Sequence, residues 1–385
     1  MKKINNFALD PDEVTLEQFK HCYEQEFVEK AALMPDAHVG YVAPIGSVLV
    51  TKDYVVPSWV GFDIGCGMTA VHIKGKGLLE KIKEKKEKIY DKVNEKIPMG
   101  KGNVNQVKNI TEETKAEYEK LLEKFKEGPY EKDVLQFLET TGIKHLGSLG
   151  HGNHFVEIGF FEEEPWIVVH SGSRGVGFKV ATRYMKASAG QEKEFEQTFP
   201  IHKDSDVGKK YLNILDFGLE FALLNRMEII RKVISSIEDV LEEKIEYELW
   251  VNKNHNHAIE ENGLFIHRKG ATPAKKGERG VIPANMRDGS FLVEGKGNKE
   301  FLESSSHGAG RIMSRTEAKE NISMAQFEKS MEGIRGTVEE GTLDESPMAY
   351  KNIYEVMEAQ KDSVKTVKQL KPLINWKGSN KQKNH

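Results

Sequence analysis

Glycine and proline interrupt this chain at short intervals in three regions, and that spacing limits the folds that it can adopt. Residues 33–72, 141–177 and 245–300 consist of brief apolar runs separated by Gly or Pro every few residues. Runs of this kind predict short strands joined by turns. Because they recur along the whole chain, we expect one α+β domain with a central β core instead of several independent domains.

Segments with helical character lie between these regions. Residues 78–96 and 111–127 are rich in Lys and Glu and predict exposed helices, whereas 211–244 has apolar residues at helical spacing. We therefore expect helical insertions at about 78–135 and 178–244 around the β core.

The last part of the chain is expected to be helical from residue 312 to about 361 and then to change character. Residues 367–385 contain five Lys and no acidic residue. Terminal segments of this kind are commonly frayed, so a loose basic end is the first expectation for them.

The composition excludes several kinds of protein. Hydrophobic residues make up 38% of the chain and charged residues 30%, so it is not intrinsically disordered. No apolar run approaches the roughly 18 residues of a membrane span, and the N-terminus lacks a secretory signal, so we expect a cytoplasmic protein without membrane contact. The only cysteines, Cys22 and Cys66, exclude a disulfide scaffold. The net charge of −4 indicates no general preference for nucleic acid, so any such binding must be local.

Two glycine-rich motifs carry residue types that bind metals. In GFDIGCG (61–67), Asp63 and Cys66 are three residues apart and could reach one metal ion or two neighbouring ions. A turn cap and an inert buried thiol are the alternatives. His154 in HGNHFVE could likewise be a metal ligand or a hydrogen-bonded residue where a strand begins.

Three further motifs combine histidine with groups that suit an anion. VVHSGSRG places His170 at a strand end, and hydroxyls, backbone N–H groups and Arg174 follow it. NKNHNHAIEENGLFIHRKG contains His255, two more histidines and a basic turn. SSSHGAGR surrounds His307 with small residues, so its ring could attack phosphorus while backbone N–H groups and Arg311 hold the charge. A plain turn is the alternative for VVHSGSRG, and a helix-capping loop is the alternative for SSSHGAGR.

Ligand type and missing motifs narrow the chemistry further. Cysteine together with histidine favours zinc or iron over magnesium when ligand softness alone is considered. The chain has neither a P-loop GxxxxGK[ST] nor a paired-cysteine deaminase signature, which argues against an ordinary P-loop nucleotidase and against a zinc deaminase.

Taken in order, seven motifs resemble the RtcB family of RNA ligases. The match runs from about residue 33 to Gly378, and several of the motifs are long and rare. The resemblance implies an RtcB-like ligase domain over 1–378 and a short basic tail at 379–385. The motifs are MPDAHVG (34–40), PIGSV (44–48), VGFDIGCGM (60–68), GNHFVE (152–157), HSGSRG (170–175), HRKGAT (267–272) and SHGAGR (306–311).

The resemblance implies a GTP- and manganese-dependent RNA ligase that acts in tRNA splicing or RNA repair. Such enzymes join an RNA 3′-phosphate or 2′,3′-cyclic phosphate end to a 5′-hydroxyl end. His307 matches the histidine that attacks the α-phosphate of GTP and carries GMP; the guanylate passes to the RNA 3′-phosphate, and the 5′-hydroxyl then displaces GMP. A metal-dependent RNA-end phosphoesterase that uses no GTP is the alternative function, and a non-catalytic protein that binds RNA ends or nucleotides is a third.

The resemblance also implies two Mn(II) ions per chain, bridged by Cys66. Asp63, Cys66 and His154 match the ligands of one ion, and Cys66, His170 and His255 match those of the other. Two cations suit phosphoryl transfer, because together they can clamp the attacking and leaving oxygens.

The family's nucleotide contacts carry over to this chain as well. Glu157 is expected to accept hydrogen bonds from guanine N1–H and N2–H₂, Tyr350 to stack on the nucleotide, and Asp36 to position the reacting histidine or a metal-bound group. Arg174, Arg268, Lys269 and Arg311 are expected to contact RNA or nucleotide phosphates. The residues expected to bind guanylate are Asn153, His154, Phe155, Val156, Glu157, His255, Asn256, Pro283, Ala284, Asn285, Met286, Ser290, His307, Gly308, Ala309, Gly310, Tyr350 and Lys377.

The chain departs from the family pattern at a few positions. The family usually has a Gly-Ser pair after the proline where this chain has Ala284-Asn285, and Tyr is common where His257 stands. The expected partners are GTP and RNA with the ends named above, and an activator protein, archease, which helps some members. We expect a monomer.

Overall fold

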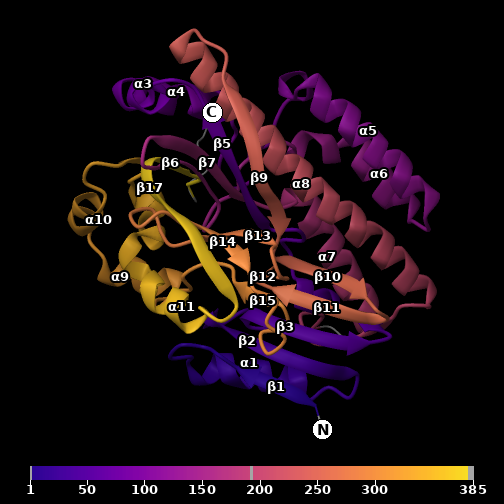
Figure 1. The fold of residues 1–385 in the computed structure, drawn as a ribbon. Coiled ribbons are helices and arrows are strands. Elements are labelled where there is room, and N and C mark those ends of the chain that lie inside the picture. The colour runs from indigo at the N-terminus through magenta and orange to yellow at the C-terminus, as the bar shows by residue number, and fades with distance from the viewer. Residues whose placement is uncertain (1, 191–193, 380–385) are drawn as a thin grey trace.

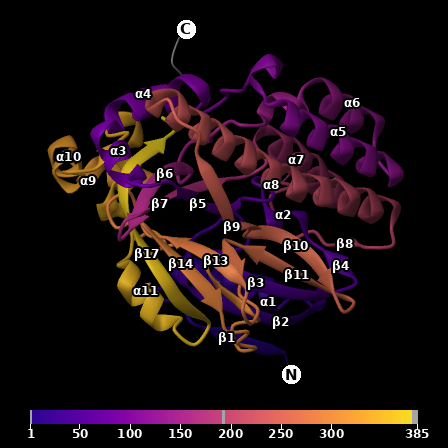
Figure 2. The same cartoon turned by 45° about the horizontal axis from the view of Figure 1, so that its top comes forward.

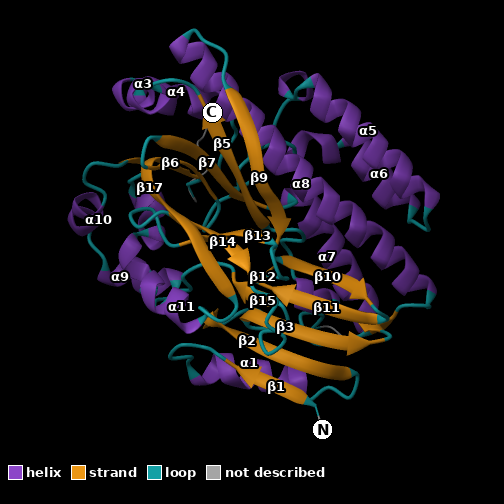
Figure 3. Ribbon diagram, in the orientation of Figure 1, coloured by secondary structure: helices purple, strands orange, loops and turns teal. Residues whose placement is uncertain are grey.

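Two β-sheets form the centre of the molecule, and helices cover them on the outside (Figures 1 and 3). The structure is a computed structural model that describes residues 2–190 and 194–379. Strands and helices are mixed along the chain, as expected for the α+β class, and the expectation of a central β core is confirmed.

The larger sheet is antiparallel along its main path and nearly closes on itself. Its two end strands, β9 and β13, approach each other, and the Lys253 ammonium of β9 donates to the Arg279 carbonyl oxygen of β13 at 2.6 Å. The strand β16 (Arg335–Gly336) pairs in parallel with β17. The order of the main path is β13 (Arg279–Pro283), β14 (Ser290–Gly295), β17 (Val364–Lys377), β6 (Phe155–Phe161), β7 (Glu164–Ser171), β5 (Gly67–Lys74) and β9 (Glu246–Asn254).

The smaller sheet lies below the larger one in Figure 1 and contains the N-terminal strands. Only its β1–β2 pair is parallel. Two short ladders accompany it, β12 (Ala271–Pro273) with β15 (Ser304–Ser306) and β4 (Tyr54–Val55) with β8 (Ile201–His202). The order of the smaller sheet is β1 (Lys3–Asn6), β2 (Val28–His38), β3 (Ile45–Lys52), β11 (Leu264–Lys269) and β10 (Asn256–Glu261).

The long helix α8 (Asp206–Leu241) covers the larger sheet and organises the helical layer (Figure 2). Ser205 caps its first turn by accepting a hydrogen bond from the Gly208 N–H at 3.0 Å. Its apolar face packs Ile229, Ile230 and Val233 into one buried cluster with side chains of the sheet. This packing holds the helix against the ends of the strands that carry the candidate site.

The remaining helices pack against α8, cover the smaller sheet or, after residue 312, lie beside β17 (Figure 1). Helices were expected at 78–96, 111–127 and 211–244, and each of these ranges is largely helical, with a break at Lys85. The other helices are α1 (Glu13–Tyr23), α2 (Pro57–Val60), α3 (Leu78–Glu84), α4 (Lys86–Lys96), α5 (Glu112–Glu127), α6 (Lys132–Thr140), α7 (Arg174–Ala189), α9 (Arg315–Asn321), α10 (Met324–Ser330) and α11 (Ile353–Ala359), with 3₁₀ turns η1 (Val107–Asn109), η2 (Gly142–His145), η3 (Glu340–Glu345) and η4 (Pro347–Ala349).

The expectation of a frayed basic end from residue 367 is wrong for the described part of that segment. Residues 364–377 form β17, an interior strand that pairs with β14 on one side and β6 on the other. Leu370, Ile374 and Trp376 are buried on it, and their burial outweighs the solvation of the lysines between them. The helical expectation for 312–361 is confirmed only in part, since three short helices are separated by β16 and two 3₁₀ turns. Residues 380–385 lie outside the described part.

Candidate active site

Four neighbouring strands of the larger sheet bring histidine and cysteine side chains to one edge. His154 directly precedes β6, His170 is near the end of β7, Cys66 directly precedes β5, and His255 directly follows β9. Because neighbours in this sheet run antiparallel, the start of one strand lies beside the end of the next. The register places Met68 opposite His170 and Gly67 opposite Asn254.

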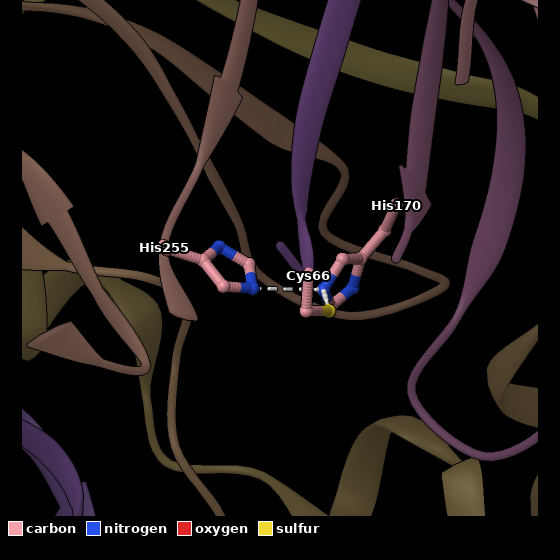
Figure 4. Close-up of side chains that lie close together, drawn as sticks. All are labelled: Cys66, His170 and His255. Carbon is pink, nitrogen blue, oxygen red and sulfur yellow. Dashed lines mark hydrogen bonds between the residues drawn. The ribbon is translucent and has the colours of Figure 1, made fainter. Parts of the chain in front are cut away.

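The side chains at this edge form two groups of three that share Cys66. The Cys66 sulfur lies 3.3 Å from His154 Nε2 and 3.2 Å from His170 Nε2, and His170 Nε2 lies 3.2 Å from His255 Nε2 (Figure 4). His154 Nε2 is also 2.8 Å from the Asp63 carboxylate. Within each group, Asp63–Cys66–His154 and Cys66–His170–His255, the ligand atoms lie within 4.8 Å of one another.

The environment of these groups fits metal cations. Burial lowers the pKa of His170 and of His255 well below the ordinary range, so both imidazoles are neutral and have a lone pair to offer. Burial beside Asp63 raises the pKa of the Cys66 thiol, and a bound cation would reverse that effect by stabilising the thiolate. Burial alone would also raise the pKa of Asp63, but His154 and Arg174 hold it at about 2. Three imidazoles, a thiol and a carboxylate converge here, which is a donor set for borderline metals.

Arg226, on the buried face of α8, holds this edge together, and it was not predicted as a site residue. Its side chain is fully buried and donates to the carbonyl oxygens of Gly65 and Ser171, both at 2.9 Å. It also donates to the Asn254 side-chain oxygen at 2.7 Å. Gly65, Ser171 and Asn254 are the chain neighbours of Cys66, His170 and His255. One guanidinium group therefore holds together the three segments that carry these predicted metal ligands. Its remaining contacts are Thr69 Oγ1 at 3.1 Å and Asn252 Oδ1 at 2.9 Å.

The two groups that share Cys66 are together called the metal-type cluster. His307 lies beside this cluster and is oriented by Asp36. Its Nδ1 is 2.7 Å from Asp36 Oδ2, which also accepts from the backbone N–H groups of His307 and Gly308. The ring of His307 lies 4.9 Å from that of His255, centroid to centroid. With Nδ1 engaged by the carboxylate, Nε2 is the ring nitrogen left for chemistry.

Glu157 lies on β6, and its side chain reaches Ser290 of β14 and Asn375 of β17. Ser290 Oγ donates to one of its oxygens at 3.2 Å, and Asn375 Nδ2 donates to the other at 3.3 Å. Burial raises the pKa of Glu157 to about 7 against these hydrogen bonds and the charge of Lys377. With a pKa near neutral pH, this buried carboxyl group can be protonated or ionised, and its ionised form accepts hydrogen bonds from N–H donors.

A buried ion cluster that the sequence did not indicate surrounds Lys377. Glu345 accepts from the Lys377 ammonium at 3.1 Å, from Arg315 at 2.7 Å and from the Tyr350 hydroxyl at 2.5 Å. Arg311 is 3.3 Å from the same carboxylate and lies over the Tyr350 ring. Burial alone would raise the pKa of Glu345, but Lys377 and the two arginines hold it at about 2.

The other predicted nucleotide contacts fall into two places. Asn153, Phe155 and Val156 adjoin Glu157, and the Asn153 carbonyl oxygen lies 3.1 Å from His170 Nδ1. Pro283 lies beside Gly308, since a Cβ on that glycine would be 3.3 Å from the Pro283 carbonyl oxygen. Near them are Ala284, Asn285 and Met286 in the turn after β13, Ala309 and Gly310 in the His307 loop, and Asn256, whose side chain donates to the Asp63 carbonyl oxygen at 3.2 Å.

The four predicted phosphate-binding cations occupy different environments. Arg174 is half-buried at the start of α7, 3.4 Å from each of its hydrogen-bond acceptors. Arg311 belongs to the ion cluster described above. Lys269 is buried and donates to the Val60 carbonyl oxygen at 3.3 Å. Arg268 is buried and donates to Ser304 and His257, so it offers no solvent-facing donor in this structure.

Comparisons with known proteins identify the family to which this chain is similar. The family model described as tRNA-splicing ligase RtcB matches residues 18–378. RNA-splicing ligase RtcB1 from Escherichia coli ATCC 25922 is 34% identical over 90% of both chains, and RNA-splicing ligase RtcB from Escherichia coli K12 is 33% identical over the same shares. The tRNA-splicing ligase RtcB of Nanoarchaeum equitans is 29% identical over 86% of this chain and 84% of its own.

Within residues 2–190 and 194–379, no helix has the length and apolar character that crossing a membrane requires. The family match covers nearly the whole chain and includes every residue of the two groups that share Cys66. The relatives that match over nine tenths of this chain are named RNA-splicing ligases. The chain therefore belongs to the RtcB family of tRNA-splicing ligases.

Proposed function

We propose that this protein joins RNA 3′-phosphate or 2′,3′-cyclic phosphate ends to 5′-hydroxyl ends, with GTP and Mn(II). In the proposed reaction His307 Nε2 attacks the α-phosphorus of GTP and releases pyrophosphate. A 2′,3′-cyclic phosphate is first hydrolysed, so that water breaks its bond to the 2′-oxygen and leaves a 3′-phosphate. The GMP then moves from the histidine to the RNA 3′-phosphate, and the 5′-hydroxyl attacks that activated phosphate and releases GMP. The placement of His307, oriented by Asp36 and next to the paired metal-type cluster, is the single observation that carries this proposal.

The proposed metal ligands are the two groups that share Cys66. Asp63, Cys66 and His154 would hold one ion, and Cys66, His170 and His255 the other. When bound, two Mn(II) ions would neutralise phosphate charge and align the attacking and leaving oxygens. Burial keeps the imidazoles of His170 and His255 neutral, and His154 and Arg174 keep Asp63 ionised. The Cys66 thiol would lose its proton when an ion binds.

The proposed guanine recognition depends on Glu157. An ionised Glu157 would accept from guanine N1–H and N2–H₂, a pair of donors that adenine does not present. Ser290 and Asn375 orient the carboxylate through their hydrogen bonds. Lys377 and Arg311, which Glu345 holds in place, are the cations available for the phosphates of the nucleotide.

Labelling with [α-³²P]GTP and MnCl₂, followed by denaturing gel electrophoresis, tests the proposal. We expect label that stays on the protein, survives alkali, is lost in acid and is discharged on adding RNA with a 3′-phosphate. The His307→Asn variant should bind GTP and Mn(II) but take no label. His257→Asn should still be labelled, because His257 contacts Arg268 and belongs to neither of the two groups that share Cys66. A label that persists in His307→Asn would overturn the assignment of the nucleophile. Release of phosphate from RNA ends without any nucleotide, and without joining, would identify a phosphoesterase instead.

A further inference from the structure

Three aromatic side chains from separate segments meet beside the candidate active site. The ring of Phe62 lies 5.7 Å from that of Tyr41, edge to face, and 5.2 Å from that of Phe178 in a stacked arrangement, centroid to centroid. We call Tyr41, Phe62 and Phe178 the aromatic rim. Tyr41 belongs to the loop between β2 and β3, Phe62 to the loop before β5, and Phe178 to the first turns of α7.

Packing within the fold does not explain why the rings of Tyr41 and Phe178 lie where they do. Phe62 contacts a buried cluster and is anchored by it, but 74% of Tyr41 and 59% of Phe178 remain exposed. Single exposed apolar residues are common on protein surfaces, whereas aromatic rings that touch one another and remain open to solvent usually mark a contact site.

Each segment of the aromatic rim also carries a residue of the candidate site. Tyr41 lies five residues after Asp36, which is near the end of β2, Phe62 directly precedes Asp63, and Phe178 lies one helical turn after Arg174. The side chain of Asp63 is 34% exposed, whereas that of its partner His154 is 7% exposed. The metal-type cluster therefore opens to solvent on the side of Asp63, where Phe62 lies.

We propose that the aromatic rim is a binding site for single-stranded RNA, where bases next to the reacting end stack on Tyr41 and Phe178. This inference rests on the proposed ligase function, because that function requires an RNA strand to pass the open side of the cluster. Arg174 is one turn from Phe178 and lies beside His154 of the metal-type cluster, since a Cβ on Gly150 would be 2.5 Å from its Nη1 and 2.1 Å from His154 Nδ1. Its guanidinium therefore places a positive charge next to the cluster, where the backbone of that strand would run. A cationic track next to aromatic rings is the usual arrangement for single strands, and it tolerates any base because every base has a flat apolar face.

The structure favours RNA over a protein partner as the occupant. The aromatic rim adjoins the open side of the cluster, so a protein docked on it would cover the route by which substrate reaches Asp63. It consists of only three rings, which is far less surface than a stable protein interface needs. A strand two or three nucleotides long would cover it.

Binding of a short RNA that carries 2-aminopurine tests this inference directly. The probe is a single-stranded 10-mer with a 3′-phosphate and the fluorescent base next to that end, titrated with Mn(II)-loaded protein in the absence of GTP. We expect quenching with wild-type protein, and a dissociation constant 5- to 150-fold higher for Tyr41→Ala and Phe178→Ala, the range that corresponds to about 1–3 kcal/mol per stacked base.

Phe178→Trp should retain quenching and affinity, whereas Phe178→Leu, which is apolar but not flat, should not. Tyr247→Ala, at the far end of β9, is the matched control and should behave as wild type.

Labelling with [α-³²P]GTP, run on the same proteins, separates this inference from the proposed function. If wild-type protein takes no GMP label but the rim variants still lose RNA affinity, the proposed chemistry fails and the binding site stands. If wild-type protein is labelled and ligates while both alanine variants bind RNA within twofold of wild type, the inference is overturned. A dimer in sedimentation that both alanine variants dissociate would also overturn it, in favour of contact between two copies of the chain.

Discussion

Replacing Arg226 by Met should weaken both the fold and the proposed metal centre, because the two depend on the same guanidinium. Met has a similar length and fits an apolar helix face, so the change removes hydrogen bonds without leaving a large cavity. The carbonyl oxygens of Gly65 and Ser171 lose a charged donor at 2.9 Å. A buried carbonyl without a partner costs about 1–3 kcal/mol, so the two together predict a loss of about 4 kcal/mol in the free energy of unfolding.

That loss converts into a measurable change in melting temperature. An unfolding entropy of about 2.1 cal/mol/K per residue amounts to roughly 0.8 kcal/mol/K for a chain of this length, so Arg226→Met should melt about 5 °C lower in calorimetry. The affinity for Mn(II), measured by isothermal titration, should fall about 10- to 100-fold, as it does when a residue that positions ligands is removed.

Arg231→Met on the same helix is the control for this variant. Arg231 pairs with Glu113 and Glu117 of α5, away from the candidate site. Its loss should lower the melting temperature and leave the Mn(II) affinity unchanged. The reasoning is refuted if Arg226→Met binds Mn(II) as tightly as wild type while remaining folded, or if the two variants lose Mn(II) affinity to the same degree.

Three further predictions concern the same site. Atomic emission after dialysis should find two Mn(II) per wild-type chain and about one in each of the variants His154→Ala and His255→Ala. Cys66→Ala should retain fewer than one, because Cys66 belongs to both groups. One ion retained in Cys66→Ala would show that Cys66 does not bridge the two ions. The pKa of Glu157 is raised to about 7, so its carboxylate is mostly ionised only above that pH. We therefore expect the affinity for GTP to rise about tenfold from pH 6 to pH 8 in wild type but not in Glu157→Gln. Equal pH profiles for the two proteins would contradict the role of Glu157. Asp36→Asn should slow labelling of His307 by GTP at least 100-fold with Mn(II) content unchanged, and labelling at the wild-type rate would show that Asp36 does not orient the ring.

The sequence predicted the parts of the site that lie in short glycine-rich motifs. Asp63 and Cys66 could be paired from their spacing alone, and the structure brings both to His154. Glycine at position 67 also has a local reason, because a Cβ there would be 2.1 Å from the Lys253 carbonyl oxygen on the neighbouring strand. Such close approaches can be recognised in the sequence because only glycine fits them.

The residues that act on these motifs from a distance could not be predicted in the same way. Arg226 lies in the middle of a helix whose period predicts a buried face, and a charged residue on that face was its only signal. Glu345 stands in an irregular stretch, and its four partners come from positions 311, 315, 350 and 377. Contacts between segments so far apart depend on the whole topology, which composition and periodicity do not determine.

The basic C-terminal segment shows how a charge count can mislead. Five lysines suggested a solvated end, yet three of them stand in β17 among the buried residues Leu370, Ile374 and Trp376. Lys377, the last residue of β17, is itself buried against Glu345. Apolar residues between the lysines were the better guide, because their burial decides whether a strand forms.

The position of β17 also has a consequence for how the protein matures on the ribosome. This strand joins the β13–β14 hairpin to strands β6, β7, β5 and β9, so the larger sheet stays in two separate parts until residues 364–377 have been synthesised. Asn375 and Lys377 arrive with the same strand, next to Glu157 and Glu345. A nascent chain thus joins the two parts of its sheet and gains the partners of Glu157 and Glu345 in one late step, and a translation product interrupted before residue 364 would lack both.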